Sequence, residues 1–256
     1  MTQKELVIMT GNIGSGKSLI ASKYAKNGYV IVSMDSIQAM VGGGEYGLYD
    51  NEKKDIYHAT ESSAIVTALD HGLSVVVDRT NMDAGRRSRY IEKGKIFDAK
   101  IISYDFGLGD IEGFKRRIKN SHGIPEQQWM GVLHYMQENY QKPSLDEGFD
   151  QIIQAPEKYY IYAFDFDGTL VENRYPEIGE LKPDKVENLR NLWQDHSNII
   201  IIWTCRHGDQ INQMRAFLLK NKIPFDFINE NPIFDAGSRK VFAHEYWDDR
   251  NKVPEM

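Results

Sequence analysis

The chain has 256 residues, of which 41% are hydrophobic and 27% are charged, and its formal net charge at pH 7 is −6. This length predicts two compact domains. No apolar run approaches the roughly 20 residues of a membrane helix, and the first residues do not resemble a secretory leader, so we expect a cytosolic protein without a membrane partner. The acidity argues against bulk coating of nucleic acid, but it leaves open a local basic groove.

A glycine-rich segment, residues 11–18, follows the apolar run at residues 6–9 and precedes helical spacing at residues 19–25. A strand, a glycine loop and a helix in this order predict a phosphate-binding P-loop, whose backbone N–H groups and positive helix end face one anion. The alternative is an ordinary glycine turn. The P-loop predicts ATP and Mg²⁺ as ligands, with Lys17 on the β- and γ-phosphates and Ser18 on the metal. The nucleotide-binding residues are then Gly11, Gly14, Ser15, Gly16, Lys17 and Ser18.

Buried strands are predicted at residues 29–33, 74–78, 99–104 and 149–153, with helices at residues 51–70 and 125–140. This alternation predicts an α/β domain with a parallel sheet flanked by helices, over residues 1–157. Ligands collect at the carboxyl ends of such strands. The candidate residues at those ends are Asp35, Gln38, Asp78, Thr80, Asn81 and Arg86.

Two features of this domain have more than one interpretation. Asp35 is either the N-cap of the next helix or a carboxylate that accepts a proton from an attacking hydroxyl. The run at residues 115–119, which contains Arg116 and Arg117, is either a solvated helix face or a lid whose arginines meet the transferring phosphate.

With these residues, the first domain resembles the kinase half of the bacteriophage polynucleotide kinase-phosphatases and the wider group of small P-loop kinases. The resemblance implies transfer of the ATP γ-phosphate to a 5′-hydroxyl of DNA or RNA, with Asp35 as general base and Arg116 and Arg117 in the lid. Two positions differ from that family, because Gln38 and Asn120 stand where it has arginines.

A polar segment at residues 141–158 precedes a second α/β pattern, which we assign to a domain at residues 158–256. An apolar strand within residues 160–170 ends in Asp165 and Asp167, and alternation points both carboxylates the same way. Two like charges so placed indicate either a bound cation or a shared proton.

Further along, an apolar strand predicted at residues 198–203 ends in Thr204, and a helix is predicted at residues 209–220. Lys240, Asp248 and Asp249 follow. With Asp165 and Asp167, these residues resemble the haloacid dehalogenase phosphatase superfamily, in particular its small capless members with a Rossmann-like sheet. The resemblance implies that Asp165 forms an aspartyl-phosphate and that Asp167 protonates the leaving oxygen. It also implies that Thr204 and Lys240 bind phosphoryl oxygens, and that Mg²⁺ is held by Asp165, Asp167, Asp248 and Asp249.

About forty residues separate Asp167 from Thr204, and about forty separate Thr204 from Lys240. Neither interval has room for an inserted cap domain, so we expect an open site that suits a nucleic-acid end. Arg206 and its neighbour His207, with residues 174–175, are candidates to line the entrance, or they are ordinary loop charges. The single cysteine, Cys205, excludes a disulfide within the chain and is expected to be a buried bystander.

These features predict a bifunctional enzyme for nucleic-acid ends, an ATP-dependent 5′-hydroxyl kinase joined to a Mg²⁺-dependent 3′-phosphatase, whose partners are DNA or RNA strand ends. One alternative is a kinase of a nucleoside, nucleotide or modified base fused to a phosphatase of other specificity. Another is a nucleotide-gated binding protein with one or both sites inactive. We also expect the phosphatase sheet to be completed by the kinase domain or by a neighbouring subunit in a homo-oligomer.

Overall fold

The computed structural model describes residues 3–44, 49–109, 114–115, 125–233 and 241–250. The chain divides into two compact units, Met1–Ala155 and Pro156–Met256. Both are α/β units with parallel sheets, which confirms the predicted fold class at this level. Among the described residues, no helix is both long enough and apolar enough to cross a membrane.

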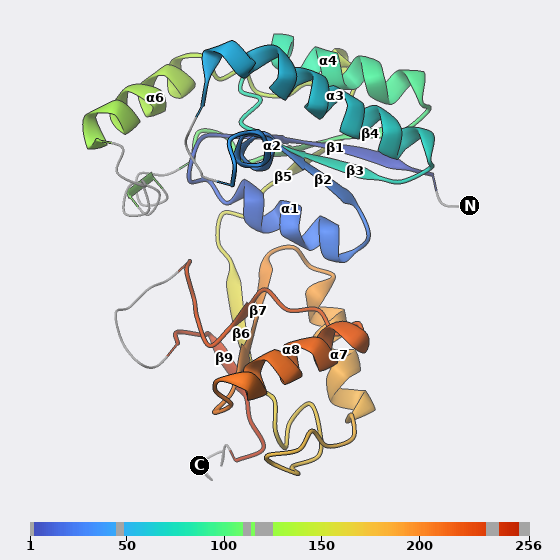
Figure 1. Ribbon diagram of the computed structural model, residues 1–256, viewed down its shortest axis with the longest axis vertical. Coiled ribbons are helices and arrows are strands. Elements are labelled where there is room, and N and C mark those ends of the chain that lie inside the picture. Colours follow the sequence, from blue (N-terminus) through green and yellow to red (C-terminus); the bar gives the residue numbers. More distant parts are fainter. Residues whose placement is uncertain (1–2, 45–48, 110–113, 116–124, 234–240, 251–256) are drawn as a thin grey trace. The chain divides into compact units, whose positions relative to one another are not determined.

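The first unit is built on a five-stranded parallel sheet (Figure 1). Its strand order is β2 (Val30–Ser33), β3 (Val75–Asp78), β1 (Glu5–Thr10), β4 (Lys100–Asp105) and β5 (Gln151–Gln154). Helix α1 (Lys17–Lys26) lies on one face of the sheet, and α3 (Lys54–Asp70) and α4 (Ala84–Ile96) lie on the other (Figure 1). The described residues of this unit also form the short helix α2 (Met34–Val41), helix α6 (Glu126–Glu138) and the 3-10 turns η1 (Asn51–Lys53) and η2 (Leu145–Glu147).

The continuous apolar runs of β1 and β3 are explained by burial on both faces of the sheet. Leu6, Ile8, Val75 and Val77 belong to one core cluster, which also takes Tyr57 from α3. The helix predicted over residues 51–70 begins instead as the 3-10 turn η1, and α3 starts at its end. The reason is local, because the Asp50 side chain accepts a hydrogen bond from the Glu52 backbone at 2.9 Å and caps the tight first turn.

The second unit contains a four-stranded parallel sheet. The strand order is β8 (Phe227–Ile228), β7 (Asn198–Trp203), β6 (Tyr160–Asp165) and β9 (Glu245–Trp247). Helices α7 (Pro183–Trp193) and α8 (Asp209–Lys220) pack on it and contribute to its core. Helix α7 is not among the predicted elements. Between Thr204 and residue 233 the chain forms only α8, β8 and their loops, so no cap domain is inserted there.

Candidate functional sites at the carboxyl edges of the two sheets

The glycine-rich segment forms a tight loop after β1. The Gly11 backbone N–H donates to the Thr80 carbonyl at 2.9 Å, and the Asn12 N–H approaches the Gly107 carbonyl at 3.3 Å. Gly11 has a φ of +150°, and a β-carbon there would come within 2.6 Å of the Phe106 β-carbon. Only glycine fits this position without displacement of its neighbours.

Lys17 begins α1 and folds back over the loop. Its side chain is buried, and its ammonium donates to the Asn12 carbonyl and to the Ser15 hydroxyl, the latter at 3.3 Å. Gly16 caps α1 in a left-handed conformation, and the first turn holds no acidic residue. No acidic side chain of its own first turn offsets the positive end of the helix, and the loop fits the phosphates of a nucleotide.

Asp35 is not the N-cap of α2. The cap is Ser33, whose hydroxyl accepts from the Ser36 N–H at 3.5 Å, while Asp35 is exposed in the first helical turn. The capping interpretation of Asp35 is therefore wrong. Gln38 is partly exposed three residues further along the same helix, a spacing that puts both side chains on one face.

Asp78 ends β3 and belongs to the same electrostatic group as the P-loop. Burial raises the pKa of the Asp78 carboxyl and the nearby charge of Asp35 raises it further, whereas a hydrogen bond with Ser18 and the charge of Lys17 lower it. The structure thus brings the predicted residues Lys17, Ser18, Asp35 and Asp78 into one neighbourhood.

Asn81, one of the predicted substrate contacts, is buried in the loop after β3. It is 1% exposed, and its amide nitrogen donates to the Met9 carbonyl at 2.9 Å. Its backbone is left-handed, with a φ of +42°. Asn81 therefore ties the loop after β3 to the end of β1.

Thr80 and Arg86 are half-buried. Thr80 contributes its carbonyl to the Gly11 contact described above. The Arg86 guanidinium lies 3.0 Å from Asp83, the N-cap of α4, and 3.5 Å from the Tyr135 hydroxyl. Arg116, Arg117 and Asn120 lie outside the described residues.

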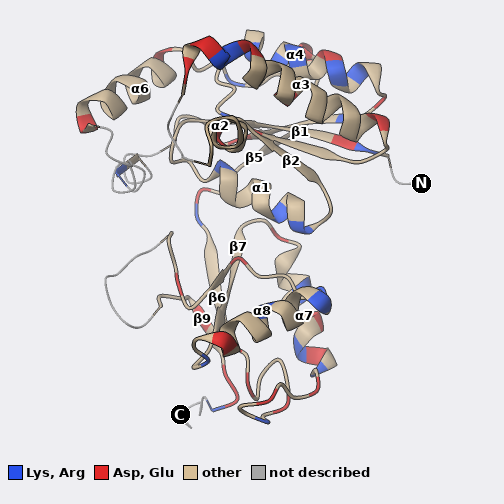
Figure 2. Ribbon diagram, in the orientation of Figure 1, with Lys and Arg blue, Asp and Glu red and all other residues tan. Residues whose placement is uncertain are grey.

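An ion-pair network surrounds the buried carboxylate of Glu61, next to the end of β3. Arg79 donates to both carboxylate oxygens of Glu61 at 3.0 and 3.1 Å, and the Tyr90 hydroxyl donates to Glu61 at 2.9 Å. Arg89 approaches the same carboxylate at 3.8 Å. Figure 2 shows how basic residues gather on α4, which carries Arg89. Sequence patterns did not reveal the network, because its members come from α3, α4 and the end of β3.

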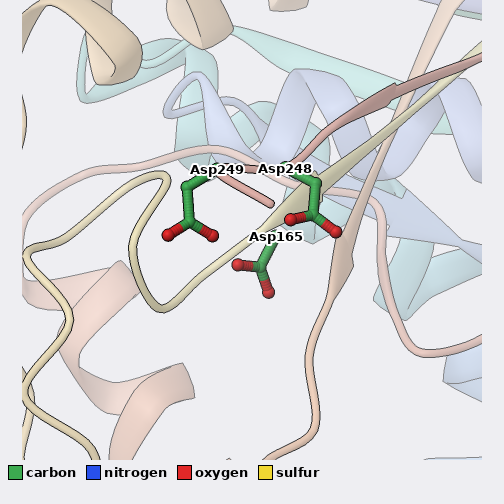
Figure 3. Close-up of side chains that lie close together, drawn as sticks. All are labelled: Asp165, Asp248 and Asp249. Carbon is green, nitrogen blue, oxygen red and sulfur yellow. The ribbon is translucent and has the colours of Figure 1, made fainter. Parts of the chain in front are cut away.

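Three carboxylates meet at the carboxyl edge of the second sheet (Figure 3). Asp165 ends β6, whereas Asp248 and Asp249 follow β9, the strand paired with β6. One oxygen from each lies within 4.8 Å of the others. Oxygen ligands in this number and arrangement fit Mg²⁺, which keeps several waters when it binds to proteins.

The crowding changes the protonation of Asp165. Burial and then the charge of Asp248 raise its pKa to about 7, with smaller contributions from Asp249 and Asp167 and an opposing hydrogen bond from the Phe166 backbone. The shared edge therefore accommodates either a proton or a cation, the two explanations that the paired aspartates suggest.

Arg206 does not lie where an entrance residue was expected, and Asp167 is paired with it rather than grouped with the other metal-ligand candidates. The Arg206 side chain is fully buried, and its guanidinium donates to both oxygens of Asp167 at 2.7 and 2.8 Å. It also donates to the carbonyls of Pro176 and Glu177. Arg206 therefore does not line an entrance, and Asp167 is not grouped with the three carboxylates that could share a metal. This pairing bridges 39 residues and cannot be read from local spacing.

Thr204 is held by a residue that the sequence analysis missed. The Thr204 N–H donates to the Asn229 side chain at 2.8 Å, and the Asn229 amide donates back to the Thr204 carbonyl at 2.8 Å. The Thr204 hydroxyl accepts from the Arg206 N–H at 3.1 Å. The available signal was a polar residue directly after strand β8, at the same edge. Lys240 lies outside the described residues.

Cys205 is exposed, so the expectation of a buried cysteine is wrong. It lies in the loop after β7, between buried Thr204 and buried Arg206. His207 is exposed as well, and so are residues 174–175, which lie on the loop after β6.

A protein of Acanthamoeba polyphaga mimivirus named as a bifunctional polynucleotide phosphatase/kinase is 30% identical over 156 residues. These residues are 59% of this chain, which spans only 32% of that relative.

Two solved structures are also similar. A conserved protein from Bacteroides thetaiotaomicron has 34% identity, over 38% of this chain and 84% of that one, with a TM-score of 0.34. A chain in the structure of the Pnkp1/Rnl/Hen1 RNA repair complex has 20% identity, over 98% of this chain and 91% of that one, with a TM-score of 0.44.

A family model described as AAA domain matches residues 6–141, which run from β1 and the P-loop to the end of the helix α6 and beyond. The phosphate-binding loop after β1 is thereby confirmed as part of a P-loop, kinase-like domain. Since the match takes in just over half of the 256 residues, the chain belongs to the AAA domain family.

Proposed function

We propose that the chain is a bifunctional enzyme that repairs nucleic-acid ends. Its first unit phosphorylates 5′-hydroxyl ends with ATP, and its second unit removes 3′-phosphates with the help of Mg²⁺. The observation that carries the proposal is the carboxylate cluster of Asp165, Asp248 and Asp249 on a second sheet of a chain that already has a P-loop. The similarity to the mimivirus phosphatase/kinase supports the same combination.

In the kinase reaction, the P-loop N–H groups and Lys17 hold the phosphates of ATP. Asp35 accepts the proton of the attacking 5′-hydroxyl while that oxygen bonds to the γ-phosphorus and the bond to ADP breaks. Asp78 orients Ser18 through their hydrogen bond. Mg²⁺ held near Ser18 would offset negative charge on the phosphates.

In the phosphatase reaction, an Asp165 oxygen attacks the phosphorus, and Asp167 donates a proton to the strand oxygen that leaves. Water then attacks the aspartyl-phosphate, gives its proton to Asp167 and releases inorganic phosphate. Arg206 keeps the Asp167 carboxylate in place through its two hydrogen bonds. Mg²⁺ held by the three clustered carboxylates would offset repulsion between the nucleophile and the phosphate.

The test is an assay of the full chain on one oligonucleotide with a 5′-hydroxyl and a 3′-phosphate, with labelled ATP and Mg²⁺. We expect Asp35→Asn to abolish 5′ phosphorylation and to leave 3′ dephosphorylation at the wild-type rate. We expect the converse for Asp165→Asn. Both substitutions are nearly isosteric, so each variant serves as the folding control for the other.

Different outcomes would point elsewhere. Phosphorylation of a free nucleoside in preference to the oligonucleotide would identify the nucleoside as the acceptor. This outcome would agree with Gln38 on α2, where the kinases that the chain resembles have an arginine. Nucleotide binding without any transfer would make the first unit a nucleotide-gated binding domain. An Asp165→Asn variant that still removes the 3′-phosphate would refute the assignment of the nucleophile.

A further inference from the structure

Tyr175 is an exposed aromatic residue fixed beside the Asp167–Arg206 pair. Half of its surface is exposed, at 50%. Its hydroxyl donates to the Gln210 side chain at 3.1 Å, in the first turn of α8. The Arg206 guanidinium lies over its ring, 5.5 Å from the centroid. The ring is therefore held at two points, although it faces solvent.

The backbone that follows Tyr175 is fixed by the same guanidinium. Arg206 donates to the carbonyl of Pro176 at 2.9 Å and to that of Glu177 at 2.8 Å, and its remaining bonds go to Asp167. The buried guanidinium of Arg206 thus fixes the positions of both the Asp167 carboxylate and the Tyr175 ring. A rigid ring loses little conformational entropy when a second planar group stacks on it.

Arg206 lies over one side of the ring, and half of the Tyr175 surface is exposed, which leaves room for a planar group on the other side. We propose that this side stacks on the base of the nucleotide whose phosphate is removed, which makes Tyr175 a specificity-determining residue of the phosphatase. Asp167 meets the oxygen that leaves, and a terminal base is the nearest large planar group attached to that oxygen's sugar. The inference rests on the proposed phosphatase function.

The chemical class follows from the ring. Aromatic side chains stack on any base, because every base has a π-face, and a stacked base typically contributes about fivefold or more in affinity. The expected substrate is therefore a 3′-phosphorylated strand of any terminal base, and a strand that ends in an abasic sugar phosphate should bind more weakly.

The test compares two oligonucleotides that differ only at the 3′-phosphorylated terminus, one with a base and one abasic. For the wild-type chain we expect KM to be about fivefold to tenfold lower with the base. Tyr175→Phe should keep this preference and Tyr175→Leu should abolish it, with kcat little changed. Tyr135→Leu is the matched control, because Tyr135 is equally exposed, at 50%, and lies on α6 of the first unit.

Two results would overturn the inference. One is an unchanged base preference in Tyr175→Leu. The other is an equal fall of kcat on both substrates, which would mean that the ring only shields the Asp167–Arg206 pair from water.

A binding measurement separates this inference from the proposed function. In the Asp165→Asn background, an oligonucleotide with 2-aminopurine at the 3′-phosphorylated end should lose fluorescence on stacking, and Tyr175→Leu should restore it. Quenching without turnover by the wild-type chain would refute the phosphatase and keep the stacking site. Turnover without quenching would refute the stacking site and keep the phosphatase.

Discussion

Single residues at the carboxyl edge of the second sheet have little freedom to change. Gly168 follows the Asp165–Asp167 strand end with a φ of +95°, and a β-carbon there would lie 2.3 Å from an Asp249 oxygen. Because Asp249 also donates its N–H to the Thr169 hydroxyl at 2.9 Å, its backbone is held, and an added β-carbon at residue 168 would have to push the carboxylate out of its place in the cluster.

We therefore expect Gly168→Ala to displace Asp249, to weaken Mg²⁺ binding at least tenfold and to abolish phosphatase activity. Kinase activity should persist. Calorimetric titration with Mg²⁺ measures the change in Mg²⁺ affinity. The control is Gly28→Ala, since Gly28 has a similar φ of +93° but no atom within 4 Å of an added β-carbon. Equal Mg²⁺ affinities in the two variants would contradict the expectation.

The protonation of Asp165 gives a prediction with a definite sign. Its folded-state pKa of about 7 lies above that of an unfolded aspartate. The native state thus binds the proton more tightly. Without metal, the burial of the Asp165 carboxylate and then its repulsion by Asp248 lower stability progressively as the pH rises from about 4 to about 7. A cation relieves this repulsion and competes with the proton.

Mg²⁺ should therefore raise the melting temperature of the second unit at pH 8 and have little effect at pH 5. Thermal unfolding with millimolar Mg²⁺ or with a chelator at both pH values checks this. Asp248→Asn should remove the Mg²⁺ response and also raise the metal-free stability at pH 8. A metal response of equal size at pH 5 and pH 8 would be inconsistent with a cluster that exchanges a proton for a cation.

Several roles at this scale could be predicted from the sequence, and others could not. Asp165 ends a predicted apolar strand, but its grouping with Asp248 and Asp249 was expected only from the resemblance of the motifs, because the short strand β9, Glu245–Trp247, was not among the predicted elements. The pairing of Asp167 with Arg206 could not be predicted, because Arg206 reaches it across 39 residues from a loop. Asn81 misled for a related reason, since the same strand-end position served to tie β1 to the loop after β3.

At the scale of elements, the P-loop depends on how α3 and α4 are held on the sheet. Glu61 of α3 is 4% exposed on its side chain and pairs with Arg79 and Arg89, while burial and the charges of these arginines lower the pKa of His58. Arg79 lies between Asp78 and Thr80, which contact Ser18 and Gly11. The network therefore links two helices to the nucleotide site.

Removal of the Glu61 charge should be costly, because it leaves two partly buried guanidinium groups without their counter-ion. We expect Glu61→Gln to lower the free energy of unfolding of the first unit by about 3 kcal/mol and to weaken ATP binding. Denaturant unfolding measures this cost. Asp70→Asn, at the exposed end of the same helix, should change stability by less than about 0.5 kcal/mol. A smaller effect for Glu61→Gln than for Asp70→Asn would mean that the network contributes nothing.

Element positions were predicted well where a strand is buried on both faces. The expected and observed bounds agree fully at β7, Asn198–Trp203, and at α8, Asp209–Lys220. Helix α7 escaped prediction, although Pro183 at its first position is a recognised start signal. Its apolar positions, Val186, Leu189 and Trp193, are spread thinly among charged residues.

At the scale of the whole molecule, the two units have sheets of unequal extent. The outer strands of the second sheet, β8 and β9, have only two and three residues. Short outer strands give a small sheet few backbone hydrogen bonds and little buried area. We therefore expect residues 158–256, expressed alone, to lack cooperative unfolding and phosphatase activity. A stable, active monomer of this fragment, measured by calorimetry and sedimentation, would refute this expectation.

The distance along the chain between Asp165 and its two acidic partners also affects how the protein matures during translation. Thr80 and Gly107 already complete the loop around Gly11 and Asn12, so the kinase pocket can form while the ribosome is still making the rest. The acidic cluster of the second unit cannot, because Asp248 and Asp249 leave the exit tunnel more than eighty residues after Asp165. If the proposed function holds, a nascent chain would thus be able to add phosphate to an end before it could take one away.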